Sequence, residues 1–156
     1  MKLSILTIGK KDDPLYATAV ADFTARTQHY FHTAWKILPS AKNVNAPVET
    51  QKKEEGETIL KNIKADDFVI LLDERGNTIS SVVFAELLQK HLSRSTKQVV
   101  FVIGGAFGVS DEVWKRANFT LSLGKMVFPH GIVRLLLIEQ IYRAGTILRG
   151  EKYHHQ

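Results

Sequence analysis

Two segments of this chain combine residue types that can bind a small molecule and move a proton. Residues 99–108 form an apolar, β-branched run that ends in Gly104, Gly105 and Gly108, and residues 121–130 form a second run that ends in Pro129 and His130. Glycine lets a backbone approach a ligand closely or adopt positive φ. An imidazole titrates near neutral pH and can act as a general base or a hydrogen-bond donor. The two segments therefore predict a ligand pocket with one acid–base group.

The spacing of the glycines narrows the class of ligand. The order Gly-Gly-x-x-Gly fits neither the dinucleotide fingerprint nor the phosphate loop of ATPases, which argues against NAD and ATP. Taken alone, the glycines are more typical of a tight strand-to-helix turn. Taken alone, His130 is more typical of a residue that caps the following helix or bonds to a backbone carbonyl. Two such loops at one edge of a parallel sheet favour a pocket. We expect Leu72, Gly104 and residues 123–128 to form its walls, which would suit an adenine-bearing cofactor.

The net positive charge of the chain lies entirely in its last 44 residues. Residues 113–156 hold seven Lys and Arg against two Asp and Glu, which accounts for the whole net charge of +5. A localised basic region is what binding to a phosphate backbone requires, although a solvated face would give the same count. The C-terminal residues pair cations with an aromatic ring, which suits a nucleotide or else a frayed terminus. These residues are Arg149, Lys152, Tyr153, His154 and His155.

Composition excludes several other classes of site. The chain has no cysteine, so disulfides, thiolate metal sites and a cysteine nucleophile are ruled out. We find no histidine pair or carboxylate cluster at metal-ligand spacing, and the pairs at 54–55 and 66–67 lie in surface-like contexts. Apolar runs are too short to cross a bilayer, and the N-terminus is typical of a strand rather than a signal peptide. We therefore expect a cytoplasmic protein that binds neither a metal nor a membrane.

Strand and helix patterns alternate along the whole chain. Hydrophobic periodicity and capping residues predict strands at 3–8, 35–38, 68–72, 98–103 and 119–123. Helices are expected from Pro14, over 49–64, after Ser80 or Ser81, from Ser110 through residue 115, and over 132–148. Residues 73–77 are expected to form a turn, and His91 is expected to lie on the surface of a charged helix. The order predicts a single α/β domain over residues 1–156 with a parallel sheet.

The last of these helices has little polar surface. Ten of its residues between 132 and 148 are apolar, so the helix is expected to be buried on more than one side. One side must meet the sheet. In so small a domain, the other side is expected to meet a second copy of the chain, which predicts a homodimer.

Several longer motifs resemble one known family. They are the opening Met1-Lys-Leu with Gly9-Lys10, residues 103–108, Leu121-Ser-Leu-x-x-Met-x-Phe-Pro-His130, Val133-Arg-x-Leu-Leu-x-Glu-Gln-x-Tyr-Arg143, and the ending Tyr153-His154. Together they are similar to the ribosomal RNA large-subunit methyltransferase H family, the smallest type of SPOUT-class methyltransferase. The resemblance spans the chain. It implies a homodimer and a deep trefoil knot in the C-terminal part of the sheet, which general connection rules would not predict.

The same resemblance implies a reaction and the residues that perform it. The reaction is methyl transfer from S-adenosyl-L-methionine to N3 of a pseudouridine in 23S rRNA of assembled ribosomes. His130 would accept the N3 proton or hold the base, with Tyr153 and His154 as partners that could reach the pocket of the other subunit. RNA contacts fall to Arg149, Lys152 and His155, the last of which stands where the family usually has a basic residue. The cofactor contacts would be Leu72, Gly104, Leu123, Gly124, Lys125, Met126, Val127 and Phe128.

Two other functions remain compatible with these residues. A related knotted methyltransferase acting on tRNA would share the cofactor pocket. A non-enzymatic module that binds the ribosome would keep the fold and the basic surface, but it would have no reason to bind the methyl donor.

Overall fold

The computed structural model describes residues 1–155 as an α/β sandwich built on a five-stranded parallel sheet. The strands are β1 (Lys2–Ile8), β2 (His32–Leu38), β3 (Phe68–Thr78), β4 (Gln98–Ile103) and β5 (Phe119–Ser122). Their spatial order is β2-β1-β4-β3-β5, and every pair of neighbours is parallel. Helices cover both faces, as parallel sheets require.

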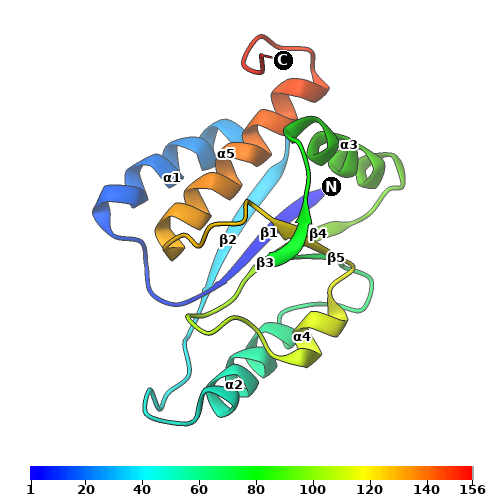
Figure 1. The fold of residues 1–156 in the computed structure, drawn as a ribbon. Helices are drawn as coiled ribbons and strands as arrows, with labels where there is room; N and C mark the ends of the chain where they lie inside the picture. The colour runs from blue at the N-terminus through cyan, green and yellow to red at the C-terminus, as the bar shows by residue number, and fades with distance from the viewer. Residues whose placement is uncertain (156) are drawn as a thin grey trace.

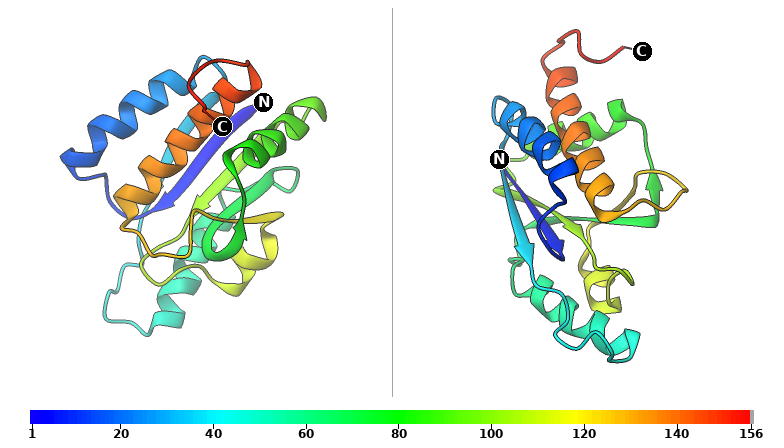
Figure 2. Two further views of the ribbon diagram at one scale, coloured as in Figure 1. Left: turned by 45° about the horizontal axis from the view of Figure 1, so that its top comes forward. Right: turned by 90° about the vertical axis from the view of Figure 1, so that its left-hand side faces the viewer.

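The five helices divide between the two faces (Figure 1). One face carries α1 (Pro14–Thr27), α3 (Ser81–Ser93) and α5 (His130–Leu148), and the other carries α2 (Val48–Leu60) and α4 (Asp111–Arg116). Figure 2 shows the same two layers from the side. The central strands explain this arrangement, because alternate residues enter two separate cores. Phe101 packs under α3 and α5, while Val100 and Val102 pack with Ile59 and Val113 on the opposite face.

Local sequence signals account for most helix starts. Asp13 caps α1 by accepting a hydrogen bond from the Leu15 amide at 2.8 Å, and Ser80 caps α3 in the same way with the Val83 amide. Ser110 caps α4. Such side-chain acceptors satisfy amides that the first turn of a helix leaves without a partner. The expected order of strands and helices is confirmed, with ends that differ by a few residues.

Two expectations from the sequence are wrong. Residues 73–77 do not form a turn, because β3 continues through them to Thr78 and pairs again with β5 after a register shift. His91 is buried rather than exposed: its ring lies 3.8 Å from that of Phe68, and its Nδ1 contacts the Thr96 hydroxyl at 3.1 Å. In both cases a contact with a distant strand outweighs the polar character of the local sequence.

The register of three strands decides where the site can form. Leu72 of β3 pairs with Ile103 of β4 and with Leu121 of β5. The segments after β4 and β5 therefore leave the sheet beside residues 72–75 of β3, which itself continues to Thr78. Within the described part of the chain, no helix is long and apolar enough to cross a membrane.

The extension of β3 yields a prediction about Gly76. A Cβ at this position would lie 2.8 Å from the Thr120 carbonyl carbon and 2.9 Å from the Leu121 amide nitrogen. We expect Gly76→Ala to push β3 away from β5 and to lower the free energy of unfolding by about 1–3 kcal/mol. Urea denaturation measures the loss, and faster amide exchange at Asn77 and Thr78 would locate it. Unchanged stability and exchange would contradict this account of the extension.

Candidate functional site

A cavity of about 760 Å³ opens at the carboxyl edge of the sheet. Its walls include residues 72–75 in the middle of β3, the ends of β4 and β5, and the loops that follow β4 and β5. The volume lies in the range of about 300–1,000 Å³ that is usual for small-molecule sites. The two loops singled out in the sequence therefore meet around one space.

Most of the residues expected to hold a cofactor line this cavity. Lys125 is the exception: it does not line the cavity, although Gly124 and Met126 on either side of it do. Met126 and Val127 are 73% and 79% exposed, so large apolar side chains stand at the mouth with little protein around them. Their role in binding a cofactor stays a prediction. The expected residues found in the wall are Leu72, Gly104, Leu123, Gly124, Met126, Val127 and Phe128.

The glycine loop is closed so tightly that a side chain would not fit. A Cβ on Gly104 would lie 2.7 Å from Cγ1 of Val109 and 3.1 Å from the Gly108 carbonyl oxygen. Gly108 has a φ of +83°, and the loop closes on itself through a bridge between Gly105 and Gly108. The backbone of this loop thus forms the cavity wall directly, as expected of a loop that approaches a ligand.

His130 is the first residue of α5 and lines the same cavity, half-buried. Burial and the positive charge of Arg134 lower the pKa of His130, while the Glu55 carboxylate and a hydrogen bond with the Gly105 backbone oppose that shift. The lowered pKa keeps the imidazole neutral near pH 7, as a proton acceptor requires. The helix cap is Pro129, which makes no side-chain bond, so His130 does not cap α5.

Sequence reasoning missed two charged residues that line the same cavity as His130. Asp73 and Arg75 form an ion pair at 2.9 Å, and the Arg75 guanidinium lies 4.5 Å from the centre of the Trp114 ring. Burial acts to raise the pKa of Asp73, but the hydrogen bonds and charge of Arg75 outweigh it and hold that pKa below its usual range. Both residues lie in the segment expected to be a turn. Only the extension of β3 places them at the cavity.

Glu55 was also missed, since its acidic neighbours suggested a surface position. Its Oε1 accepts a hydrogen bond from the Ala41 amide at 3.1 Å, and its carboxylate fills the space beside Gly105. No group of three or more His, Cys, Asp or Glu side chains within residues 1–155 is arranged to hold a metal ion.

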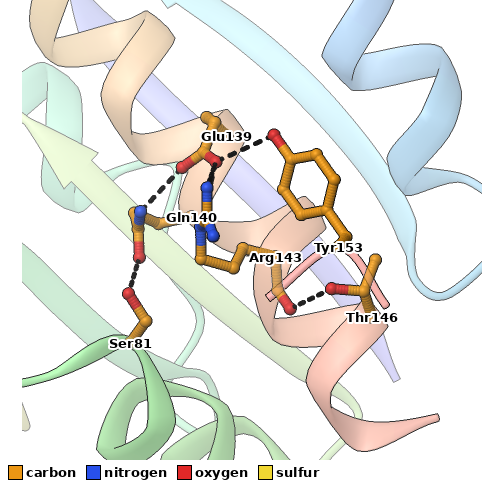
Figure 3. Close-up of polar contacts among 6 residues, drawn as sticks. All are labelled: Ser81, Glu139, Gln140, Arg143, Thr146 and Tyr153. Atoms are coloured by element: carbon orange, nitrogen blue, oxygen red, sulfur yellow. Dashed lines mark hydrogen bonds and ion pairs between the residues drawn. The ribbon is translucent and has the colours of Figure 1, made fainter. Parts of the chain in front are cut away.

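The C-terminal residues dock on the flank of α5 rather than at the cavity (Figure 3). Glu139 is the centre of this contact: its Oε1 accepts hydrogen bonds from the Tyr153 hydroxyl at 3.1 Å and from Nη2 of Arg143 at 2.6 Å. The Arg143 guanidinium lies 4.7 Å from the centre of the Tyr153 ring. The Tyr142 ring packs edge-on against the Tyr153 ring, with the two ring centres 4.8 Å apart. Gln140 links Glu139 to Ser81 of α3 through bonds of 2.6 Å each.

This docking separates the three expected catalytic residues. Glu139 lies nine residues beyond His130, roughly 13 Å along the helix at 1.5 Å per residue, so Tyr153 cannot act with the His130 of its own chain. Nδ1 of His154 is buried and has no hydrogen-bond partner among residues 1–155. Arg149 donates to the His29 carbonyl oxygen at 2.6 Å and stacks on Tyr30. Lys152 and His155, the other residues expected to contact RNA, are exposed.

Comparisons with known proteins agree with this architecture. A family profile described as "Predicted SPOUT methyltransferase" matches residues 1–154. The chain is 47% identical to the ribosomal RNA large subunit methyltransferase H of Flavobacterium johnsoniae, 46% to that of Flavobacterium psychrophilum and 43% to that of Parabacteroides distasonis, and each alignment covers 100% of both chains. A solved probable methylase family protein from Haemophilus influenzae covers 99% of this chain and 70% of its own, with a TM-score of 0.54 and 14% identity, which shows likeness of fold alone.

The network around Glu139 predicts how the C-terminal residues are held. Burial and then Glu139 raise the pKa of Tyr153. We expect Glu139→Gln to remove the charge that pairs with Arg143, to bring the Tyr153 pKa closer to 10 and to speed tryptic cleavage after Lys152 several-fold. Limited proteolysis with mass spectrometry measures the cleavage. The matched control is Glu57→Gln on the exposed face of α2, and equal cleavage in the two variants would count against the network.

Proposed function

The chain belongs to the SPOUT methyltransferase family, and we propose from this that it methylates N3 of a pseudouridine in the 23S rRNA of assembled ribosomes. The match of its entire length to relatives named ribosomal RNA large subunit methyltransferase H carries the assignment. The protein is thus an rRNA methyltransferase that uses S-adenosylmethionine. The pseudouridine, its N3 atom and the assembled ribosome are the finer parts of the proposal.

The residues at the carboxyl edge fit the methyl donor. The cavity is large enough for an adenosyl group, its walls mix apolar side chains with free backbone groups, and Gly104 keeps the loop backbone bare. When bound there, S-adenosylmethionine supplies an electrophilic methyl group on a sulfonium. Leu72, Gly104 and residues 123–128 would hold it, although Lys125 does not itself line the cavity.

The protein's part in the reaction is to position the nucleophile and to take its proton. N3 of the pseudouridine forms a bond to the methyl carbon as the bond from that carbon to sulfur breaks, and the N3 proton passes to the neutral imidazole of His130. Positioning of this kind contributes about 7 kcal/mol or more to lowering a barrier. The lowered pKa of His130 suits the acceptor role at neutral pH.

A homodimer would unite residues that a single chain separates. Tyr153 and His154 lie on the flank of α5, away from their own cavity, while Ile132, Leu135 and Leu136 leave an apolar part of α5 only half-buried. We propose that two chains pair through α5 and that the C-terminal residues of each complete the cavity of the other. Arg149, Lys152 and His155 would then lie beside the RNA.

The remaining parts of the proposal concern the chain path and its location. The chain would form one domain over residues 1–156, with the deep trefoil knot of its family in the C-terminal part. Membership of the SPOUT family supports the knot. A substrate within assembled ribosomes would place the protein in the cytoplasm.

Transfer of a labelled methyl group tests the proposed function. We expect label from S-adenosylmethionine to enter large-subunit rRNA of intact ribosomes, with mass spectrometry locating it at N3 of a pseudouridine, and little label in naked rRNA or tRNA. Gly104→Val is the matched inactive variant, since its side chain would displace Val109: calorimetry should find no cofactor binding, while circular dichroism should find the native fold. Label in tRNA alone would favour a tRNA methyltransferase. Ribosome binding without cofactor binding would favour a non-enzymatic module.

The position of His130 predicts the pH dependence of the reaction. Because burial and Arg134 lower its pKa below 6.5, and Glu55 opposes them only in part, the imidazole stays neutral until the pH falls below that lowered value. We expect kcat/KM to be level through neutral pH and to fall on the acid side. His130→Gln should remove this acid limb and reduce kcat/KM by about 10²–10⁴-fold. The exposed His29→Gln serves as the control, and an acid limb that survives in His130→Gln would assign the proton to another group.

A further inference from the structure

A second, smaller cavity lies behind His130. It measures about 320 Å³ and shares Gly105, Ala106 and His130 with the larger one. The rest of its wall comes from the loop after β1 and from the first residues of α1 and α5, among them Gly9, Lys10, Lys11, Tyr16, Gly131 and Arg134. A group bound in this cavity would therefore lie next to the imidazole that faces the methyl donor.

The most informative residue of this wall is Arg134, which is only 3% exposed. Its Nε donates to the Thr7 hydroxyl at 3.1 Å, and its Nη1 donates to the Lys10 carbonyl oxygen at 2.9 Å and to Asp12 at 2.8 Å. Nη2 donates to no acceptor within residues 1–155. A Cβ on Gly9 would lie 3.5 Å from Nη2. Because Gly9 has no side chain, Nη2 is left uncovered on that side. Nη2 is not among the fully buried polar atoms, so its pair of N–H groups is open to the cavity and available for a ligand.

The surrounding charges favour an anion. Asp12 is paired with Arg134, and Asp13 accepts the Leu15 amide at the start of α1. The Glu55 carboxylate beside Gly105 accepts the Ala41 amide, so all three carboxylates are already engaged. Lys10 and Lys11 are exposed and form no ion pair within residues 1–155. The first turns of α1 and α5 line this cavity, and the N-terminus of a helix carries partial positive charge.

We propose that the smaller cavity binds a phosphodiester group of the RNA strand, adjacent to the nucleotide that is methylated. The proposal rests on the function proposed above and names an RNA contact for it. The guanidinium of Arg134 offers paired donors that match phosphate oxygens, and the two lysines add charge at the cavity mouth. The carboxylate of the methyl donor has similar chemistry, and the experiment separates it from phosphate.

The test compares two double variants with equal loss of charge. Lys10→Ala with Lys11→Ala removes the lysines at the cavity, whereas Lys90→Ala with Lys97→Ala removes exposed lysines at the opposite edge of the sheet. We expect the first variant to bind intact ribosomes at least tenfold more weakly at low salt. Its slope of log Kd against log salt should fall by about 0.7–0.9 for each lost phosphate contact. The second variant should match the wild type, and both should bind S-adenosylmethionine with unchanged affinity.

Arg134→Lys provides a second measurement, because it keeps the charge but loses the forked donors. We expect the KM of the Arg134→Lys variant for ribosomes to rise several-fold, while its affinity for S-adenosylmethionine stays unchanged. Thermal unfolding checks that the variant is folded. Ribosome binding and a salt slope equal to wild type in the Lys10 and Lys11 variant would overturn the phosphate site. Loss of cofactor affinity with intact ribosome binding would assign the cavity to the carboxylate. A wild-type protein that neither binds nor methylates ribosomes would instead contradict the proposed function.

Discussion

The site depends on the register with which three parallel strands end at one edge of the sheet. Leu72, Ile103 and Leu121 lie side by side, so residues 73–75 of β3 and the loops after β4 and β5 border the same space. These strands are buried on both faces, and a slip of one residue would exchange their two sets of core side chains. Packing in the two cores therefore fixes the register of the strands, and this register determines where the cavity forms. Neither loop would form a pocket without the other.

One helix connects the chemistry at the cavity with the C-terminal residues. From its first residue onward, α5 carries His130, then the buried Arg134, and then Glu139 and Arg143, which hold Tyr153. These polar side chains lie on a helix that is mostly apolar. Because α5 is packed between α1 and α3, it is held rigid. The distance between His130 and the docked Tyr153 is therefore set by helix geometry. That distance is the physical reason for proposing a second copy of the chain at the site.

Local patterns predicted much of the fold and part of the site. Alternating apolar runs and the capping residues Asp13, Ser80 and Ser110 located the strands and helices, since each signal lies within a few residues of the element that it starts. The same reasoning brought seven of the eight expected cofactor residues to one cavity. It failed where a polar segment pairs with a distant strand. Asp73 and Arg75 resemble a turn by composition, yet the backbone of β5 extends β3 through them.

The sequence by itself determined the order of elements, the family of the chain and the two loops that form the larger cavity, because these depend on residue types close together along the chain. Only the tertiary structure decided that Glu55 opposes Arg134 at His130, that Nη2 of Arg134 faces a second cavity, and that Tyr153 lies far from the imidazole of its own chain. Those relations join residues separated by many positions. They follow from the strand order and from the packing of helices on the sheet, which no local pattern encodes.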